Sequence, residues 1–242
     1  MIAVVIPAHD EAAAIAACLA AVADAARCAA LADEVETIVV LDRCSDRTAV
    51  IAGAFGVTLL VEDAGNVGRA RAAGTALAIA RGARWVACTD ADSRVPSDWL
   101  SAQLALDCDM FCGMVEVDDW LDYAPDVQLR FDALHARVWN HPHVHGANLG
   151  FSSAHYLACG GFAPLAVHED VALVDAMVQI GARIVRAPTP RVATSARRHA
   201  RAAAGFSDYL DALERRLQCR AARIAAGPPL SQTPRYGVAH AG

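Results

Sequence analysis

Residues 85–93 read Trp85-Val86-Ala87-Cys88-Thr89-Asp90-Ala91-Asp92-Ser93, a short apolar run followed at once by two aspartates. The run 85–88 has the length and composition of a buried strand. At the end of a strand alternate side chains share one side, so Asp90 and Asp92 can converge on one point. Converging carboxylates need a cation, and a hard ion such as Mg²⁺ or Mn²⁺ suits oxygen ligands. An isolated Asp-x-Asp is weak evidence, because most such pairs are solvated turn residues.

The sequence before this strand alternates between strand-like and helix-like segments. Short β-branched runs predict strands, and apolar residues at helical spacing predict helices between them. This alternation predicts an α/β fold with a parallel, doubly wound sheet, in which ligands bind at the carboxyl ends of the strands. The predicted strands are 2–6, 37–41 and 58–61, and the predicted helices are 11–26, 46–55 and 68–81.

The pattern is less regular after about residue 98. We expect a helix start at 96–98, a longer strand at 109–117 and a loop or short strand at 146–152. Further helices are predicted at 129–139, at 169–179 with Gly181 as its stop, and at 204–225. One domain over residues 1–225 is the default for a chain of 242 residues, and the proline-rich tail 226–242 is expected to be flexible.

Composition narrows the class of protein. A net charge of −6 argues against a nucleic-acid-binding protein, and the absence of lysine excludes a catalytic lysine. The eight cysteines form no Cys-x-x-Cys motif and no export signal is seen, so we expect a reduced, cytoplasmic protein. No apolar run approaches the roughly 20 residues of a transmembrane helix, which leaves peripheral membrane contact open.

Four polar clusters stand in a particular order along the chain. They are Pro7-Ala8-His9-Asp10-Glu11, the segment 42–48, Asn66-Val67-Gly68-Arg69-Ala70 and Asp90-Ala91-Asp92, with His168-Glu169-Asp170 further on. This order resembles the family 2 glycosyltransferases with the GT-A fold, over roughly residues 1–205. The resemblance implies a Rossmann-like, mixed but mainly parallel sheet flanked by helices. Residues of about 1–98 would bind the nucleotide, and about 99–225 would form the acceptor and catalytic part.

The resemblance assigns a nucleotide-sugar site to the first clusters. Glu11 can accept hydrogen bonds from a ribose diol, and Arg69 can pair with a pyrophosphate. The alternatives are a helix cap for Asp10 or Glu11 and a solvated helix face for Arg69. Arg43 stands where the family has an aspartate, which leaves the base and the donor undecided. The implied nucleotide-sugar residues are Pro7, Ala8, His9, Glu11, Asp42, Gly68, Arg69, Asp90 and Arg197.

Metal and catalytic roles follow from the same resemblance. Asp92 and Asp90 would hold Mn²⁺ or Mg²⁺ on the donor diphosphate, with His199 as a candidate third ligand. Asp170 would be the general base of an inverting reaction, with Glu169 as the fallback. Such a base contributes about 10²–10⁴-fold to the rate. The alternative for both acids is to cap a helix and complement its dipole.

The acceptor side is implied to contain His145, Gly146, Ala147 and Asn148. The preceding histidines 141, 143 and 145 alternate, so they could bind Zn²⁺ if they shared one face of a strand. Pro142 and the lack of a nearby fourth ligand weigh against zinc, and a solvated or acceptor-facing loop is favoured.

The sequence thus predicts a metal-dependent glycosyltransferase that moves a sugar from a nucleotide-diphosphate sugar to a hydroxyl. A UDP-sugar is the favoured donor and a GDP-sugar the next. A sugar-phosphate nucleotidyltransferase is the first alternative, although Pro7–Glu11 replaces the Gly-rich loop of that class. A non-catalytic nucleotide-sugar-binding or scaffold protein is the second.

Overall fold

A seven-stranded sheet forms the centre of the molecule, in the order β3-β2-β1-β4-β6-β5-β7. The computed structural model describes residues 1–117, 119–120, 122–165, 167–198 and 205–225, and only the backbone of 221–225. Strand β6 runs antiparallel to its neighbours β4 and β5, and the other pairs are parallel. The predicted mixed, mainly parallel α/β sheet is therefore confirmed. The strands are β1 (Ile2–Ala8), β2 (Val35–Asp42), β3 (Thr58–Glu62), β4 (Trp85–Cys88), β5 (Met110–Val117), β6 (Leu149–Ser152) and β7 (Ile184–Thr194).

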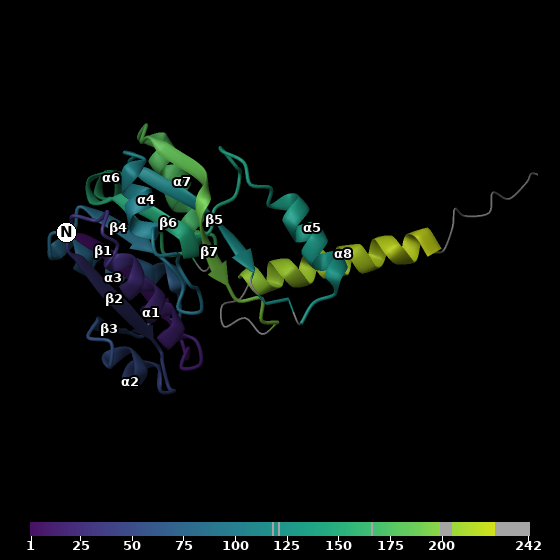
Figure 1. Cartoon of the computed structure of the whole chain (residues 1–242), viewed down its shortest axis with the longest axis horizontal. Helices are drawn as coiled ribbons and strands as arrows, with labels where there is room; N and C mark the ends of the chain where they lie inside the picture. Colours follow the sequence, from purple (N-terminus) through teal and green to yellow (C-terminus); the bar gives the residue numbers. More distant parts are fainter. Residues whose placement is uncertain (118, 121, 166, 199–204, 226–242) are drawn as a thin grey trace, which may run out of the picture.

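Helices cover both faces of this sheet (Figure 1). One face packs against α1 (Ile15–Ala26), α2 (Thr48–Gly53) and α4 (Trp99–Ala105). The other packs against α3 (Val67–Ala80), α6 (Ser153–Ala158) and α7 (Glu169–Gln179). In β1 alternate side chains enter the two cores, which is why its sequence is apolar at every position.

Two helices lie together beside the sheet and have a core of their own. Figure 1 shows α8 (Phe206–Ala225) crossing α5 (Pro125–Leu134) and reaching away from the α/β body. Val127 and Phe131 of α5 pack against Leu210 and Leu213 of α8. Within the described ranges, no helix combines the length and the apolar character that spanning a bilayer requires.

Several predicted boundaries need correction. Helix α1 begins at Ile15 rather than at residue 11, because Ala14 and Ile15 donate to the Glu11 carbonyl in a preceding turn. Helix α5 ends at Leu134, five residues before the predicted end. Helix α6 and strand β7 were not predicted, and 146–152 divides into a 3₁₀ turn (Gly146–Asn148) and β6. The tail 226–242 lies outside the described residues.

The parallel strands bring the polar clusters to one edge of the sheet. Ala8 at the end of β1 pairs with Leu41 of β2, and Val5 pairs with Cys88 at the end of β4. The residues that follow β1, β2 and β4 therefore meet at the carboxyl edge, as the alternation of strands and helices predicted.

Candidate active site

A cleft of about 860 Å³ opens at the carboxyl edge of the sheet. Its walls come from the loops after β1, β2 and β4, from the starts of α3 and α7, and from the segment before β6. The end of β7 and the start of α8 close the remaining side. The cleft therefore joins residues from both halves of the chain. Predicted residues that line it are Pro7, Ala8, His9, Glu11, Asp42, Asp90, Asp92, His145, Gly146, Ala147, Glu169, Asp170 and Arg197.

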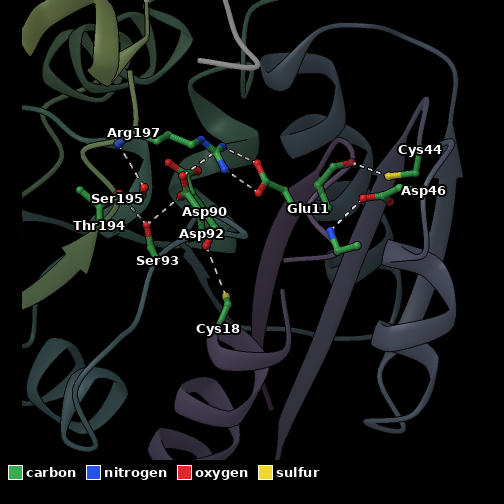
Figure 2. A network of polar contacts seen from close by, with 12 residues as sticks. Glu11, Cys18, Cys44, Asp46, Asp90, Asp92, Ser93, Thr194, Ser195 and Arg197 are labelled. Atoms are coloured by element: carbon green, nitrogen blue, oxygen red, sulfur yellow. Dashed lines mark hydrogen bonds and ion pairs between the residues drawn. The ribbon is translucent and has the colours of Figure 1, made fainter. Parts of the chain in front are cut away.

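Arg197 joins two of the acids at the centre of the cleft. Its guanidinium donates to both carboxylate oxygens of Glu11, at 2.8 and 2.5 Å, and Nη2 lies 3.1 Å from Asp92 Oδ2. Figure 2 shows this side chain reaching from the end of β7 to the loops after β1 and β4. A planar guanidinium can pair with two oxygens at once, whether they belong to a carboxylate or to a phosphate.

The surroundings of Asp92 disfavour its negative charge. Its side chain is only 16% exposed, and burial together with the charges of Asp90 and Glu11 raises its pKa to about 6, against the opposing effect of Arg197. The site is therefore short of positive charge at neutral pH. Carboxylate oxygens in such a setting suit a hard divalent ion, so the residues present fit Mg²⁺ or Mn²⁺.

The acids after β1 and β2 organise loops. Asp10 accepts the backbone N–H groups of Ser45 and Asp46, at 2.6 and 3.0 Å, which ties the first loop to the second. Asp42 Oδ1 accepts from Ala64 and Gly65, and Oδ2 accepts from Asn66. Asp42 thus shapes the entry to α3 with the carboxylate that was expected to bind the nucleotide-sugar.

A buried arginine that the sequence analysis did not single out lies beneath the turn that carries Gly146. Arg71 is 4% exposed, donates to Asp90 at 2.5 Å and forms an ion pair with buried Glu169. A Cβ at Gly146 would lie 2.5 Å from its guanidinium nitrogens, so Gly146 rests directly on Arg71. Helical spacing places Arg71 with Gly68 and Thr75 on the buried side of α3. This spacing is the sequence feature from which the burial of Arg71 could have been predicted.

Asp170 lines the cleft and is held by two backbone N–H groups. One carboxylate oxygen accepts the Gly146 N–H at 2.8 Å, and the other accepts the N–H of Val171. Glu169, its neighbour, is 4% exposed and engaged by Arg71. His168 precedes them at φ 61°, a left-handed backbone that is uncommon outside glycine and that turns the chain into α7.

Some predicted residues lie elsewhere. Three predicted residues, Gly68, Arg69 and Asn148, are not among the described residues that line the cleft. Arg69 is exposed on α3, and a Cβ at Gly68 would lie 2.9 Å from the Cβ of Glu169, so this glycine lets α3 pack against α7. Asn148 is fully buried and bonds Trp99 and the Met114 and Pro190 carbonyls, so it belongs to the core. His199 lies outside the described residues.

The start of α8 adds cleft residues that no motif indicated, namely Phe206, Ser207 and Tyr209. The rings of the alternating histidines stack in succession, with centroid distances of 6.0 Å for His141 and His143 and 5.9 Å for His143 and His145, but their nitrogens do not form one group of three. His141 is 1% exposed and bonds the Ala187 carbonyl, whereas His135 from the end of α5 joins His143 and His145.

Comparisons with known proteins agree on the fold. The chain has a TM-score of 0.66 and 15% identity to S. aureus TarS 1–349 in complex with UDP-GlcNAc, covering 85% of this chain and 61% of that one. For the mannosyltransferase PcManGT from Pyrobaculum calidifontis in complex with GDP-Man and Mn²⁺, the TM-score is 0.64 at 19% identity, covering 94% and 65%. The chain thus spans less than two thirds of either structure. No curated protein gives a significant match.

The sequence model of glycosyl transferase family 2 matches residues 3–160. This span includes the loops after β1, β2 and β4 that line the cleft, and it exceeds half of the chain. The neighbouring structures have the GT-A fold. The chain therefore belongs to glycosyl transferase family 2 and has the GT-A fold.

Proposed function

We propose that this glycosyltransferase moves a sugar from a nucleoside-diphosphate sugar to an acceptor hydroxyl, with Mn²⁺ or Mg²⁺ and with inversion at the anomeric carbon. One observation carries the proposal. The same cleft holds two neighbouring carboxylates, Asp90 and Asp92, whose negative charge is only partly balanced by nearby positive charge. It also holds a third carboxylate, Asp170, which is oriented separately. This arrangement suits a donor end that binds a divalent ion with the donor diphosphate, and an acceptor end where a carboxylate removes the proton of the acceptor hydroxyl.

The donor end consists of loops after β1, β2 and β4. Pro7, Ala8, His9 and Asp42 line it, and Arg197 can exchange its carboxylate partners for phosphate oxygens. TarS and PcManGT were solved with UDP-GlcNAc and with GDP-Man and Mn²⁺. A UDP-sugar is our first candidate donor and a GDP-sugar our second.

Asp92 with Asp90 would hold the divalent ion. When bound, the ion would stabilise the negative charge that grows on the departing diphosphate. Glu11 and Arg197 then bind and orient the donor beside it. Arg71 keeps Asp90 in place from the buried side, since its guanidinium bonds Asp90 at 2.5 Å.

Asp170 is proposed as the general base. The Gly146 N–H fixes one of its oxygens, and the carboxylate takes the proton of the acceptor hydroxyl as that oxygen attacks the anomeric carbon. Glu169 is the weaker candidate, because its carboxylate is buried and paired with Arg71.

A thermal-shift screen tests the donor site. UDP-, GDP-, dTDP- and ADP-sugars are each added with Mn²⁺ or with EDTA to the wild type, to Asp92→Ala and to Asp24→Ala. Asp24 is an exposed acid on α1 and serves as the matched control. A donor at about 100 times its Kd should stabilise the fold by roughly 2.7 kcal/mol. We expect metal-dependent stabilisation by one donor, lost only in Asp92→Ala. Stabilisation that persists in Asp92→Ala would reject Asp92 as the ligand.

Asp170→Asn tests the base, with Asp175→Asn on the exposed side of the same helix as control. In a transfer assay with an acceptor found by screening, Asp170→Asn should lower turnover about 10²–10⁴-fold while donor binding stays unchanged. Near wild-type turnover in this variant would exclude Asp170. Pyrophosphate release from a nucleoside triphosphate and a sugar phosphate would instead favour a nucleotidyltransferase. Donor binding without transfer to any acceptor would favour a binding protein.

A further inference from the structure

Three histidines from two segments meet on the acceptor side of the cleft. His135 follows α5, and His143 and His145 precede the 3₁₀ turn that carries Gly146. One ring nitrogen of each lies within 4.8 Å of the others. The ring centroids of His135 and His143 are 4.3 Å apart, and those of His143 and His145 are 5.9 Å apart. All three side chains line the cleft.

Hydrogen bonds define which nitrogens are available. His135 Nδ1 lies 3.0 Å from the Phe131 carbonyl, and His143 Nε2 lies 3.1 Å from the Leu134 carbonyl. A carbonyl only accepts, so these nitrogens carry the hydrogen, and the other nitrogen of each neutral ring carries a lone pair. Histidines that bind metals are oriented in this way, with the second ring nitrogen donating to a carbonyl or carboxylate.

The third ring supplies an unsatisfied atom. His145 Nε2 is buried and has no hydrogen-bond partner among the described residues. Buried polar atoms in folded proteins are almost always satisfied, so an orphaned imidazole nitrogen beside two oriented rings points to a ligand. Stacking of His135 on Phe131, at a centroid distance of 3.9 Å, fixes one side of the group.

Charged and titratable side chains surround the group. Arg191 and His141 face it, and the Arg191 guanidinium, whose charge opposes a bound cation, lies 3.6 Å from the carboxylate of Glu116. Asp132 on α5 is a further negative neighbour of His135.

We propose that His135, His143 and His145 bind a zinc-class transition-metal ion at the acceptor end of the cleft. Imidazole suits Zn²⁺ and its neighbours in the first transition row, whereas Mg²⁺ and Mn²⁺ prefer oxygen. Three imidazoles leave a fourth position of a tetrahedral ion open, in this case to an oxygen of water or of the acceptor. The ligand set shares no residue with Asp90 and Asp92, so the chain would have two metal sites of different chemistry.

The ion would join two parts of the molecule. His135 ends the helix that packs on α8, and His145 precedes Gly146, which donates to Asp170. In tetrahedral zinc sites with bonds of about 2.0–2.1 Å, ligand nitrogens lie roughly 3.3 Å apart. The ligand nitrogens, now within 4.8 Å of one another, therefore have to move closer, and the stacked rings have to rotate so that their lone pairs converge on the ion.

Cobalt titration of the full chain tests this proposal. Co²⁺ is added to EDTA-treated, desalted protein, and the visible bands of four-coordinate cobalt are followed before Zn²⁺ is added to displace it. We expect one such site per chain in the wild type, in Asp92→Ala and in the control His155→Ala, whose histidine lies on α6. In His143→Ala the Kd should rise about 100-fold or more, since loss of an outer-shell partner alone costs 10–100-fold.

Three outcomes would overturn the proposal. They are the absence of the cobalt bands in the wild type, equal binding by His143→Ala, and loss of binding in Asp92→Ala. The half-buried His143 is chosen because replacing the buried His135 risks misfolding. If alanine lowers the melting temperature of the metal-free protein, His143→Gln repeats the comparison. Because no donor, acceptor or turnover enters the readout, the result is independent of the proposed glycosyl transfer.

Discussion

At the scale of single residues, Arg71 has the greatest influence on the site. Burial alone would lower its pKa, and the carboxylates of Asp90 and Glu169 raise it. This one cation links the acid after β4 to the acid that begins α7, while Gly146 covers it. The loop after β4 and the start of α7 therefore share one buried cation.

Replacement of Arg71 by Met should destabilise the fold strongly. Breaking a buried ion pair by removing one partner costs about 3–5 kcal/mol, because the remaining charge stays buried and unpaired. Urea unfolding of the EDTA-treated protein measures the loss. Arg69→Met, two residues earlier and exposed, should stay within about 0.5 kcal/mol of the wild type. Similar effects of the two substitutions would contradict the role assigned to Arg71.

Asp10 gives a pH-dependent contribution of known sign. Backbone N–H groups of Ser45 and Asp46 hold its pKa below the usual 3.8. A depressed pKa contributes stability above the unfolded-state value, and this contribution is lost as the pH falls through the folded-state value. Asp10→Asn, which tolerates the same positive φ, should therefore be less stable than the wild type at pH 7, with a gap that closes below about pH 3.8. A gap in the urea midpoint that stays constant down to pH 3.5 would show that the charge is irrelevant.

At the scale of elements, α3 is positioned by a glycine in its middle. A Cβ at Gly74 would lie 2.6 Å from Val5 Cγ1 and 2.8 Å from Val40 Cγ2, so the helix contacts β1 and β2 through backbone. This close approach brings the N-terminal turn of α3, with Arg71, to the carboxyl edge of the sheet. Gly74 therefore lowers the helix propensity of α3 but lets the helix pack closely against the sheet.

Gly74→Ala should lower stability although alanine is the better helix former. Overpacking against two β-branched side chains costs about 1–3 kcal/mol, and the gain in helix propensity is about 1 kcal/mol at most. Gly53→Ala on α2 is the matched control, since its Cβ would meet only Leu59 at 3.8 Å, an ordinary contact. Calorimetric melting should therefore move down in the first variant and up in the second. An increase for Gly74→Ala would mean that α3 can shift without cost.

At the scale of the whole molecule, the sequence predicted those elements whose formation depends on residues close together in the chain. Trp85–Cys88 and Glu169–Gln179 form the predicted elements, with the same ends, because burial and helical spacing are properties of neighbouring residues. Strand β7 escaped prediction because it contains Pro188 and Pro190, which an edge strand tolerates and a central one does not.

The site was predictable only in part, because several partners are distant in sequence. The pairing of Arg197 with Glu11 spans 186 positions, and nothing near either residue indicates the other. The histidine group also depends on tertiary structure. Alternation suggested 141, 143 and 145, but α5 ends early enough for His135 to take part while His141 turns to the Ala187 carbonyl.

The acids of the cleft should reduce the stability of the whole fold when no metal is present. Asp92 is buried beside Asp90 and Glu11, and its pKa of about 6 means that the folded state disfavours its charge. A shift from 3.8 to about 6 corresponds to an upper bound of about 3 kcal/mol. Asp92→Asn should therefore raise the free energy of unfolding in EDTA at pH 8 by about 1–3 kcal/mol.

The same substitution should abolish the stabilisation that Mn²⁺ and a donor give to the wild type. Glu62→Gln, at the end of β3 and away from the lining of the cleft, serves as the control and should change neither quantity appreciably. If Asp92→Asn instead destabilises the metal-free protein, then Arg197 must compensate Asp92 fully. The carboxylates would then form a structural ion-pair network, since only a cleft that lacks positive charge gains from a divalent ion.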